Sequence, residues 1–287
     1  MKQITEQTIL NEVIRERSTD SHKGDYGRLL LIGGTYPYGG AIIMAALAAV
    51  HSGAGLVTGA TDRENIPALH SHLPEAMAFD VKDKDRLEER IARADVVLVG
   101  SGLAENDLGL KVLENVLERV NEQQVLILDG GAISLFSKAA LPFSQAQTIF
   151  TPHQKEWERL SGLPLSEQSD TANQEAVNRF AHGTIVVQKK HGTTLYQSGA
   201  ADCYQLAVGG PYQATGGMGD TLAGMIAGFA GQFSKTSLLK RVLAATYLHS
   251  AIADQLSQKA YVVLPTDISK EIPKWMKEYS GTPYYNK

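Results

Sequence analysis

The chain has 287 residues, 27 basic and 31 acidic, and its formal net charge of -4 gives it no general attraction for nucleic acid or anionic membranes. Apolar residues make up 43 % of the sequence, enough for a sizeable core, which excludes a disordered chain. The single cysteine, Cys203, excludes an intrachain disulfide and a cysteine-rich metal cluster. The charged N-terminal segment lacks the apolar core of a signal peptide, and no apolar run is long enough to span a bilayer, so we expect a soluble cytoplasmic protein.

Short strand-like runs alternate with helix-like segments along most of the chain. We expect strands at 28–34, 55–61, 95–102, 124–131, 147–153 and 183–190, helices at 40–53 and 82–94, a hairpin over 193–207 and mainly helical structure to residue 278. Strands that are apolar without alternation are typical of parallel sheets buried on both faces. The pattern predicts a three-layer α/β/α sandwich with a mostly parallel central sheet, and because no linker interrupts it, we expect 1–287 to form one domain. Thr266 and Asp267 are expected to cap the last helix.

Glycine-rich or polar segments follow several of these strands, where open α/β sheets bind their ligands. The segment from Gly33 to Gly40 lacks the G-x-G-x-x-G spacing, and no acidic residue ends the next strand, so a nicotinamide-dependent dehydrogenase is not favoured. This segment is equally consistent with a tight turn before an apolar helix and with a ligand-lining role.

A more specific loop, Thr215 to Asp220, precedes the small and apolar residues of a buried helix. Backbone N–H groups and the positive end of the helix dipole would make Gly217, Met218 and Gly219 an anion hole. Asp220 could merely interact favourably with the positive end of the helix dipole. Beside an anion hole it could also take the proton of an attacking hydroxyl. The loop therefore indicates phosphoryl transfer.

The sequence of this loop, TGGMGDTLAG, resembles the G-x-G-D signature of the ribokinase-like superfamily. Five further segments, in chain order, resemble motifs of one branch, the ADP/ATP-dependent (S)-NAD(P)H-hydrate dehydratases: KGDYGRLLLIGG, GSGLAEND, LILDGGAISL, FTPHQKEWERL and VVQKKHGTTLY. The resemblance implies a ribokinase-like fold and a lyase that repairs nucleotides. Such an enzyme dehydrates (6S)-NADHX or NADPHX to NADH or NADPH with Mg²⁺, using ADP and releasing AMP and phosphate. The hydrate hydroxyl is first phosphorylated and then eliminated.

The resemblance also implies the roles of individual residues. Asp220 would activate the hydroxyl. The nucleotide would be bound by Lys189, Lys190, His191, Gly192, Thr193 and Gly219, the hydrated dinucleotide by Ala41, Gly102, His153 and Asp220, and Mg²⁺ through water by Glu156.

Several of these residues have a simpler structural interpretation. His153 could be a helix cap and Glu156 its capping-box partner, while Lys189 and Lys190 could be a solvated strand end. For Asp129, at a strand end, we expect a structural role before a ligand contact. Lys190 stands where the family usually has glycine, and at two other positions Ser101 replaces proline and Met218 a smaller residue.

The same residues are consistent with two alternative functions, and the family resemblance also suggests protein partners. A ribokinase-like small-molecule kinase, of the hydroxymethylpyrimidine, thiazole or pyridoxal type, would have asparagine at the position of His153. A non-catalytic nucleotide-binding regulator would tolerate loss of Asp220. The family often carries an N-terminal epimerase domain, which we expect to be absent here and replaced by a separate chain. We also expect a homotetramer. The sequence leaves open whether ADP or ATP is the phosphoryl donor, and whether NADHX or NADPHX is the preferred substrate.

Overall fold

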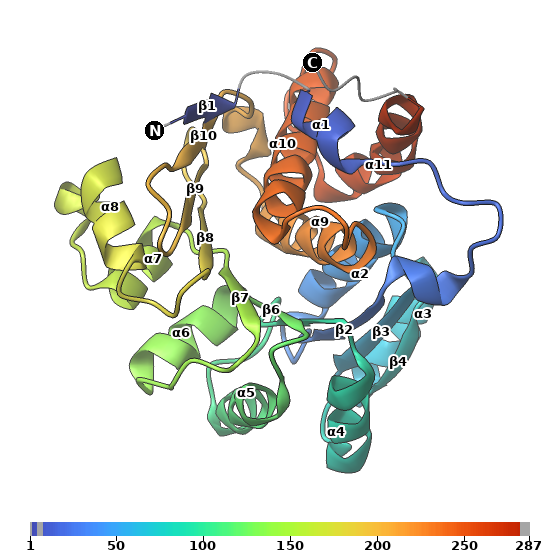
Figure 1. Ribbon diagram of the computed structural model, residues 1–287. Coiled ribbons are helices and arrows are strands. Elements are labelled where there is room, and N and C mark those ends of the chain that lie inside the picture. Colours follow the sequence, from blue (N-terminus) through green and yellow to red (C-terminus); the bar gives the residue numbers. More distant parts are fainter. Residues whose placement is uncertain (1, 5–7, 282–287) are drawn as a thin grey trace.

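The computed structural model describes residues 2–4 and 8–281, and within them ten strands form a single sheet (Figure 1). In sheet order the strands are β1 (Lys2–Ile4), β10 (Tyr204–Leu206), β9 (Thr194–Gln197), β8 (Ile185–Gln188), β7 (Gln147–Phe150), β6 (Val125–Leu128), β5 (Val96–Val99), β2 (Arg28–Ile32), β3 (Leu56–Thr61) and β4 (Met77–Asp80). All neighbours from β8 to β4 pair in parallel, and β9 runs antiparallel to both of its neighbours. The predicted mostly parallel sheet and the hairpin are therefore confirmed.

Helices cover both faces of this sheet. One face carries α1 (Thr8–Val13), α2 (Gly39–His51), α3 (Ile66–His72), α9 (Met218–Gln232), α10 (Leu238–Ser257) and α11 (Pro265–Ser280); the other carries α4 (Lys84–Arg93), α5 (Asp107–Arg119), α6 (Gly130–Lys138), α7 (Gln154–Ser161) and α8 (Asp170–Val177). Each face packs its own hydrophobic cluster against the strands. The continuously apolar strands feed both clusters, because alternate side chains point to opposite faces. The three-layer sandwich is confirmed.

Close packing between α2 and α9 fixes where the loop before α9 lies. A Cβ added at Gly224 would collide with the carbonyl of Ala45, and one at Gly228 would lie 2.7 Å from the Cβ of Ser52. The two helices therefore approach to backbone contact over their small residues. This contact holds the first turn of α9 above the carboxyl ends of the central strands.

The sequence analysis missed two strands and several helices. The strands β1 and β4 are short and lie at the edges of the sheet, and the helices that it did not predict are α1, α3, α5, α6 and α8. The predicted cap at Thr266 and Asp267 is wrong. The helix α11 begins at Pro265, which needs no N–H partner there, so both residues lie inside its first turn. Within the described ranges, no helix combines the length and the apolar character needed to cross a membrane.

Candidate active site

The loop before α9 has the geometry expected of an anion hole. Gly217 is the N-cap of α9 with a φ of 90°, and a Cβ there would collide with the thioether of Met44. The helix starts directly afterwards, because the Thr221 amide donates to the Gly217 carbonyl at 3.0 Å. The amide groups of the first turn, at Met218 and Gly219 among others, have no carbonyl one turn earlier to accept them.

Beside this loop lies a cluster of polar side chains that follow four neighbouring strands. Asp129, after β6, is 2 % exposed and accepts hydrogen bonds from Thr151 at 2.6 Å and from Ser101 at 3.1 Å. The Lys189 ammonium, after β8, lies 2.9 Å from the same carboxylate. A Cβ on Gly219 would be 3.0 Å from that ammonium, so Lys189 lies directly against the anion loop. Asp129 holds Lys189 at this position.

Asp220 points into this cluster, and its environment changes its acidity. Burial raises the pKa of Asp220 to about 6, and the charge of Asp129 acts in the same direction. The positive charge of Lys189 and the nearby Ser101 hydroxyl oppose this increase. A carboxylate with such a pKa is ionised at neutral pH yet basic enough to take a proton from a hydroxyl.

Burial opposes the charge of Lys189 as well, but Asp129 and Glu156 outweigh it and raise the pKa of this ammonium above its usual range. Lys189 therefore remains a buried cation at neutral pH. A positive charge beside a loop of backbone amides favours a bound anion.

His153 and Glu156 form the capping box of α7. The Nδ1 atom of His153 accepts from the amides of Lys155 and Glu156, and the His153 amide donates to Glu156 at 2.8 Å. Burial lowers the pKa of His153, as does the charge of Lys189, whereas burial raises the pKa of Glu156 to about 7. His153 is also half exposed at the edge of the cluster, so the cap and the site position are compatible.

A cavity of about 930 Å³ opens beside the anion loop. Eight residues that the sequence predicted for the site line it: His153, Lys189, Lys190, His191, Gly192, Thr193, Met218 and Gly219. The sequence analysis missed nine others: Val208, Gly209, Gly210, Pro211, Gln213, Ala214, Leu222, His249 and Ser250. His249 is 3 % exposed, and burial lowers its pKa to about 4, so it is a neutral polar group on the wall. The only feature of the sequence that could have indicated His249 was its position as a histidine within an apolar helical segment.

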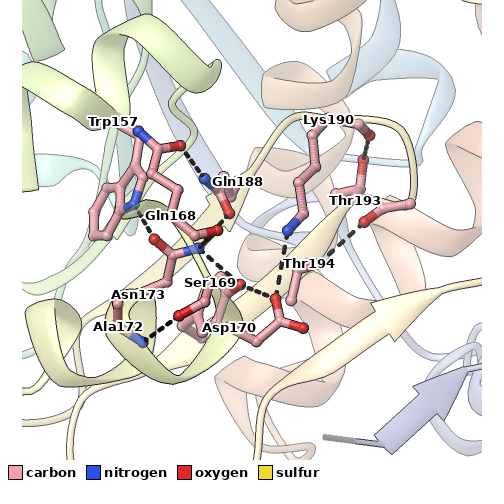
Figure 2. Close-up of polar contacts among 12 residues, drawn as sticks. Trp157, Gln168, Ser169, Asp170, Ala172, Asn173, Gln188, Lys190, Thr193 and Thr194 are labelled. Atoms are coloured by element: carbon pink, nitrogen blue, oxygen red, sulfur yellow. Dashed lines mark hydrogen bonds and ion pairs between the residues drawn. The ribbon is translucent and has the colours of Figure 1, made fainter. Parts of the chain in front are cut away.

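Lys190 is held by a buried polar network, shown in Figure 2. Its ammonium lies 3.4 Å from Asp170, which accepts from the Tyr196 hydroxyl at 2.7 Å. Asn173 donates to that hydroxyl at 3.2 Å and accepts from the Trp157 indole at 2.7 Å. The network ties the loop after β8 to the start of α8. The side chains of Lys189 and Lys190 are only 21 % and 18 % exposed, so the solvated strand end is wrong for both.

Ala41 and Gly102 lie together, but outside this cavity. A Cβ on Gly102 would be 2.8 Å from the Cβ of Ala41 and 2.5 Å from the Tyr38 carbonyl. They follow β2 and β5, whereas the cavity residues of the 189–193 loop follow β8. In the sheet order, β7 and β6 separate these two groups of strands. The predicted residues thus form two flanks, which meet at Asp220 and its neighbour Ser101.

A parallel sheet with a glycine loop and a carboxylate at the start of a buried helix defines a ribokinase-like protein. A ribokinase-like superfamily protein from Enterococcus faecalis has the same fold, with a TM-score of 0.94 and 43 % identity over 98 % of this chain and 97 % of that one. More narrowly, the chain belongs to the NAD(P)H-hydrate dehydratase family, whose model matches residues 29–274.

Two further relatives support this assignment. The chain is 60 % identical over 274 residues to the ADP-dependent (S)-NAD(P)H-hydrate dehydratase of Streptococcus pneumoniae, covering 96 % of this chain and 94 % of that protein. The Bacillus subtilis ADP/ATP-dependent NAD(P)H-hydrate dehydratase, co-crystallised with ATP and Mg²⁺, has a TM-score of 0.82 and 28 % identity over 96 % and 97 % of the two chains. The predicted family is confirmed, and the small-molecule kinase is not favoured.

Proposed function

We propose that the chain is a lyase that dehydrates (6S)-NADHX and (6S)-NADPHX, with ADP as the phosphoryl donor. The observation that carries this proposal is the position of Asp220. Asp220 directly follows Gly219, which lines the donor cavity, and its carboxylate lies near Ser101, the neighbour of Gly102 on the other flank. The dehydratase relative from Streptococcus pneumoniae supports the same reaction.

The first step is phosphoryl transfer to the hydroxyl of the hydrated nicotinamide ring. Asp220 accepts the hydroxyl proton, and the oxygen attacks the terminal phosphorus of ADP. The bond between that phosphorus and the bridging oxygen breaks, and AMP leaves with the electron pair. Gly217, Met218 and Gly219 present their N–H groups to the transferring phosphoryl group, and the buried Lys189 adds a positive charge.

The second step is elimination. The lone pair of the ring nitrogen expels phosphate from the adjacent carbon, and loss of a proton from the next carbon restores the dihydronicotinamide ring. Phosphorylation is needed because hydroxide is a poor leaving group and a phosphate ester is a good one. ADP and the hydrate are therefore converted to AMP, phosphate and NADH or NADPH.

The remaining predicted residues bind the two substrates. Lys189, Lys190, His191, Gly192, Thr193 and Gly219 line the cavity, and we assign them to the nucleotide. We assign Ala41, Gly102 and His153 to the hydrated dinucleotide. Small residues at the first two positions leave room for the ligand. His153 lines the donor cavity, so it would contact the hydrate from that side. Its Nδ1 accepts from the helix amides, and its Nε2 lies 3.4 Å from Glu156.

Mg²⁺ fits this site through water and phosphate oxygens. Among residues 2–4 and 8–281 no group of three histidine, cysteine or carboxylate side chains could hold a metal directly. Glu156 offers a buried carboxylate near the cluster, although one of its oxygens accepts from the His153 amide. Glu156 would hold the hydrated ion, which offsets the negative charge of the phosphates.

An absorbance assay tests the proposal. The hydrate lacks the long-wavelength ultraviolet absorption band of NADH, so purified protein is mixed with (6S)-NADHX, Mg²⁺ and either ADP or ATP, and that band is followed. We expect absorbance to return with ADP, more slowly with ATP, and not at all without nucleotide. The R epimer should persist. No recovery with either nucleotide would contradict the proposed function.

Four further expectations stay predictions: a single domain, a homotetramer, a separate epimerase chain and a cytoplasmic location. Light scattering on the purified protein measures its oligomeric state and so tests the homotetramer. Addition of an epimerase to the assay above should allow complete consumption of a mixed-epimer substrate.

A further inference from the structure

The turn between β2 and α2 presents two tyrosine rings to solvent. The exposed fraction is 86 % for Tyr36 and 57 % for Tyr38. Aromatic rings bury a large area when a ligand covers them, and exposed pairs of this kind favour a binding surface. This turn is the glycine-rich segment for which the sequence left a packing role and a ligand role open.

The backbone beneath these rings is held by several hydrogen bonds. The Tyr36 amide donates to the Asp62 carboxylate at 2.6 Å, and the Tyr38 amide donates to the Thr35 carbonyl at 2.7 Å. At the end of the turn, the Asn65 side chain donates to the Gly39 carbonyl at 3.1 Å. The rings are thus carried by an ordered backbone, which lowers the entropic cost of binding a ligand against them.

The turn lies on the acceptor flank of Asp220. The Thr35 hydroxyl donates to the Gly102 carbonyl at 3.1 Å, and the Tyr38 carbonyl packs against the Gly102 backbone. Gly102 follows Ser101, whose hydroxyl is close enough to Asp220 to lower the pKa of that carboxyl. The donor cavity lies on the other flank, over the loops that follow β8 and β10. In-line transfer needs donor and acceptor on opposite sides of the phosphoryl group, so the hydroxyl substrate approaches over Gly102 and Tyr38.

We propose that Tyr36 and Tyr38 form the subsite for the adenine ring of the hydrated dinucleotide. The inference rests on the proposed function. Hydration saturates one double bond of the nicotinamide ring and leaves that ring puckered, so adenine is the one flat aromatic group in the substrate. Stacking on tyrosine rings is the chemistry that recognises such a group, and it is tolerant of position.

The test compares two double variants at the same positions. Y36A/Y38A removes both rings, whereas Y36F/Y38F keeps the rings and removes only the hydroxyls. We expect the Ala variant to raise KM for (6S)-NADHX about tenfold, with KM for ADP and kcat within about twofold of wild type. The Phe variant should behave like wild type, because the stacking surface remains.

A truncated substrate separates stacking from a general defect. Hydrated nicotinamide mononucleotide keeps the reacting ring and lacks adenosine, so wild type and Y36A/Y38A should convert it with the same KM. An unchanged KM for NADHX in the Ala variant, or an equal rise with the mononucleotide, would overturn the adenine subsite. A lower oligomer mass for the Ala variant would also overturn it, since the rings would then join copies of the chain. A wild-type protein inactive on the hydrate would instead refute the proposed function itself.

Discussion

The two flanks of Asp220 are built from different groups. The donor flank is a cavity of about 930 Å³ lined by lysine, histidine and glycine-rich loops, beside an ion pair between Lys189 and Asp129. The acceptor flank consists of Ala41 and Gly102 in close contact, with the tyrosine turn beyond them, where Asp62 accepts from the Tyr36 amide. The difference follows from the ligands proposed for each flank. Phosphates need backbone amides and cations, whereas a ring needs space and a flat surface.

The largest expected effect is at Asp220, where the flanks meet. We expect Asp220→Asn to lower kcat about 10³-fold, because asparagine cannot accept the hydroxyl proton. ADP affinity, measured by calorimetry, should stay within about threefold, since the donor cavity is intact. A variant that keeps a tenth of the wild-type kcat would show that Asp220 is not the base.

Gly102→Ala should damage the acceptor flank alone. The φ of Gly102 is 70°, and a Cβ there would lie 2.5 Å from the Tyr38 carbonyl, so we expect a loss of about 2 to 3 kcal/mol in the free energy of unfolding. KM for the hydrate should rise about tenfold while KM for ADP stays unchanged.

Gly40→Ala is the matched control for this substitution. An added Cβ at Gly40 has no neighbour within 4 Å, and the residue lies in α2, where alanine is favoured. Its stability in denaturant titrations should equal or slightly exceed that of wild type. Equal losses for Gly40→Ala and Gly102→Ala would contradict the close contact on the acceptor flank.

Asp220→Asn should also change the pH dependence of stability. Burial raises the pKa of Asp220 from its ordinary 3.8 to about 6, so the folded state holds this proton more tightly than the unfolded state. That contribution to stability is complete below about pH 4 and is lost as pH rises through about 6, which costs about 3 kcal/mol at pH 8. The variant lacks this titration.

Denaturant titrations at two pH values measure the effect. Relative to wild type, Asp220→Asn should be more stable at pH 8 than at pH 4. A stability difference independent of pH would contradict the raised pKa. Wild-type kcat/KM should fall as pH drops through about 6, because the base is then protonated.

The smallest effect is expected on the donor flank, at the pair of Lys190 and Asp170. Either Lys190→Met or Asp170→Asn should raise KM for ADP about threefold to tenfold, because each releases the loop after β8 from α8. The double variant should be no worse than either single one, since both remove the same contact. Additive losses would instead indicate that Lys190 contacts the phosphates on its own. KM for the hydrate serves as the internal control.

The local features of this protein were determined by the sequence alone. The continuously apolar strands predicted the parallel sheet, and the spacing of His153 and Glu156 predicted the capping box of α7. Glycines before Asp220 predicted an anion loop at a helix start, because only glycine adopts the φ of 90° at Gly217 without strain. Such features depend on residues a few positions apart, whose chemistry a sequence displays directly.

Tertiary structure decided what surrounds these features. Asp129, Thr151 and Lys189 meet because their strands are neighbours in the sheet, although the residues lie far apart in the chain. The cavity wall at His249 depends on how α10 packs beside α9, and no local pattern distinguishes that histidine from a core residue. Burial is likewise a property of the whole fold. The loop alone predicted that Asp220 faces an anion, but only its enclosure raises the pKa of this carboxylate to about 6.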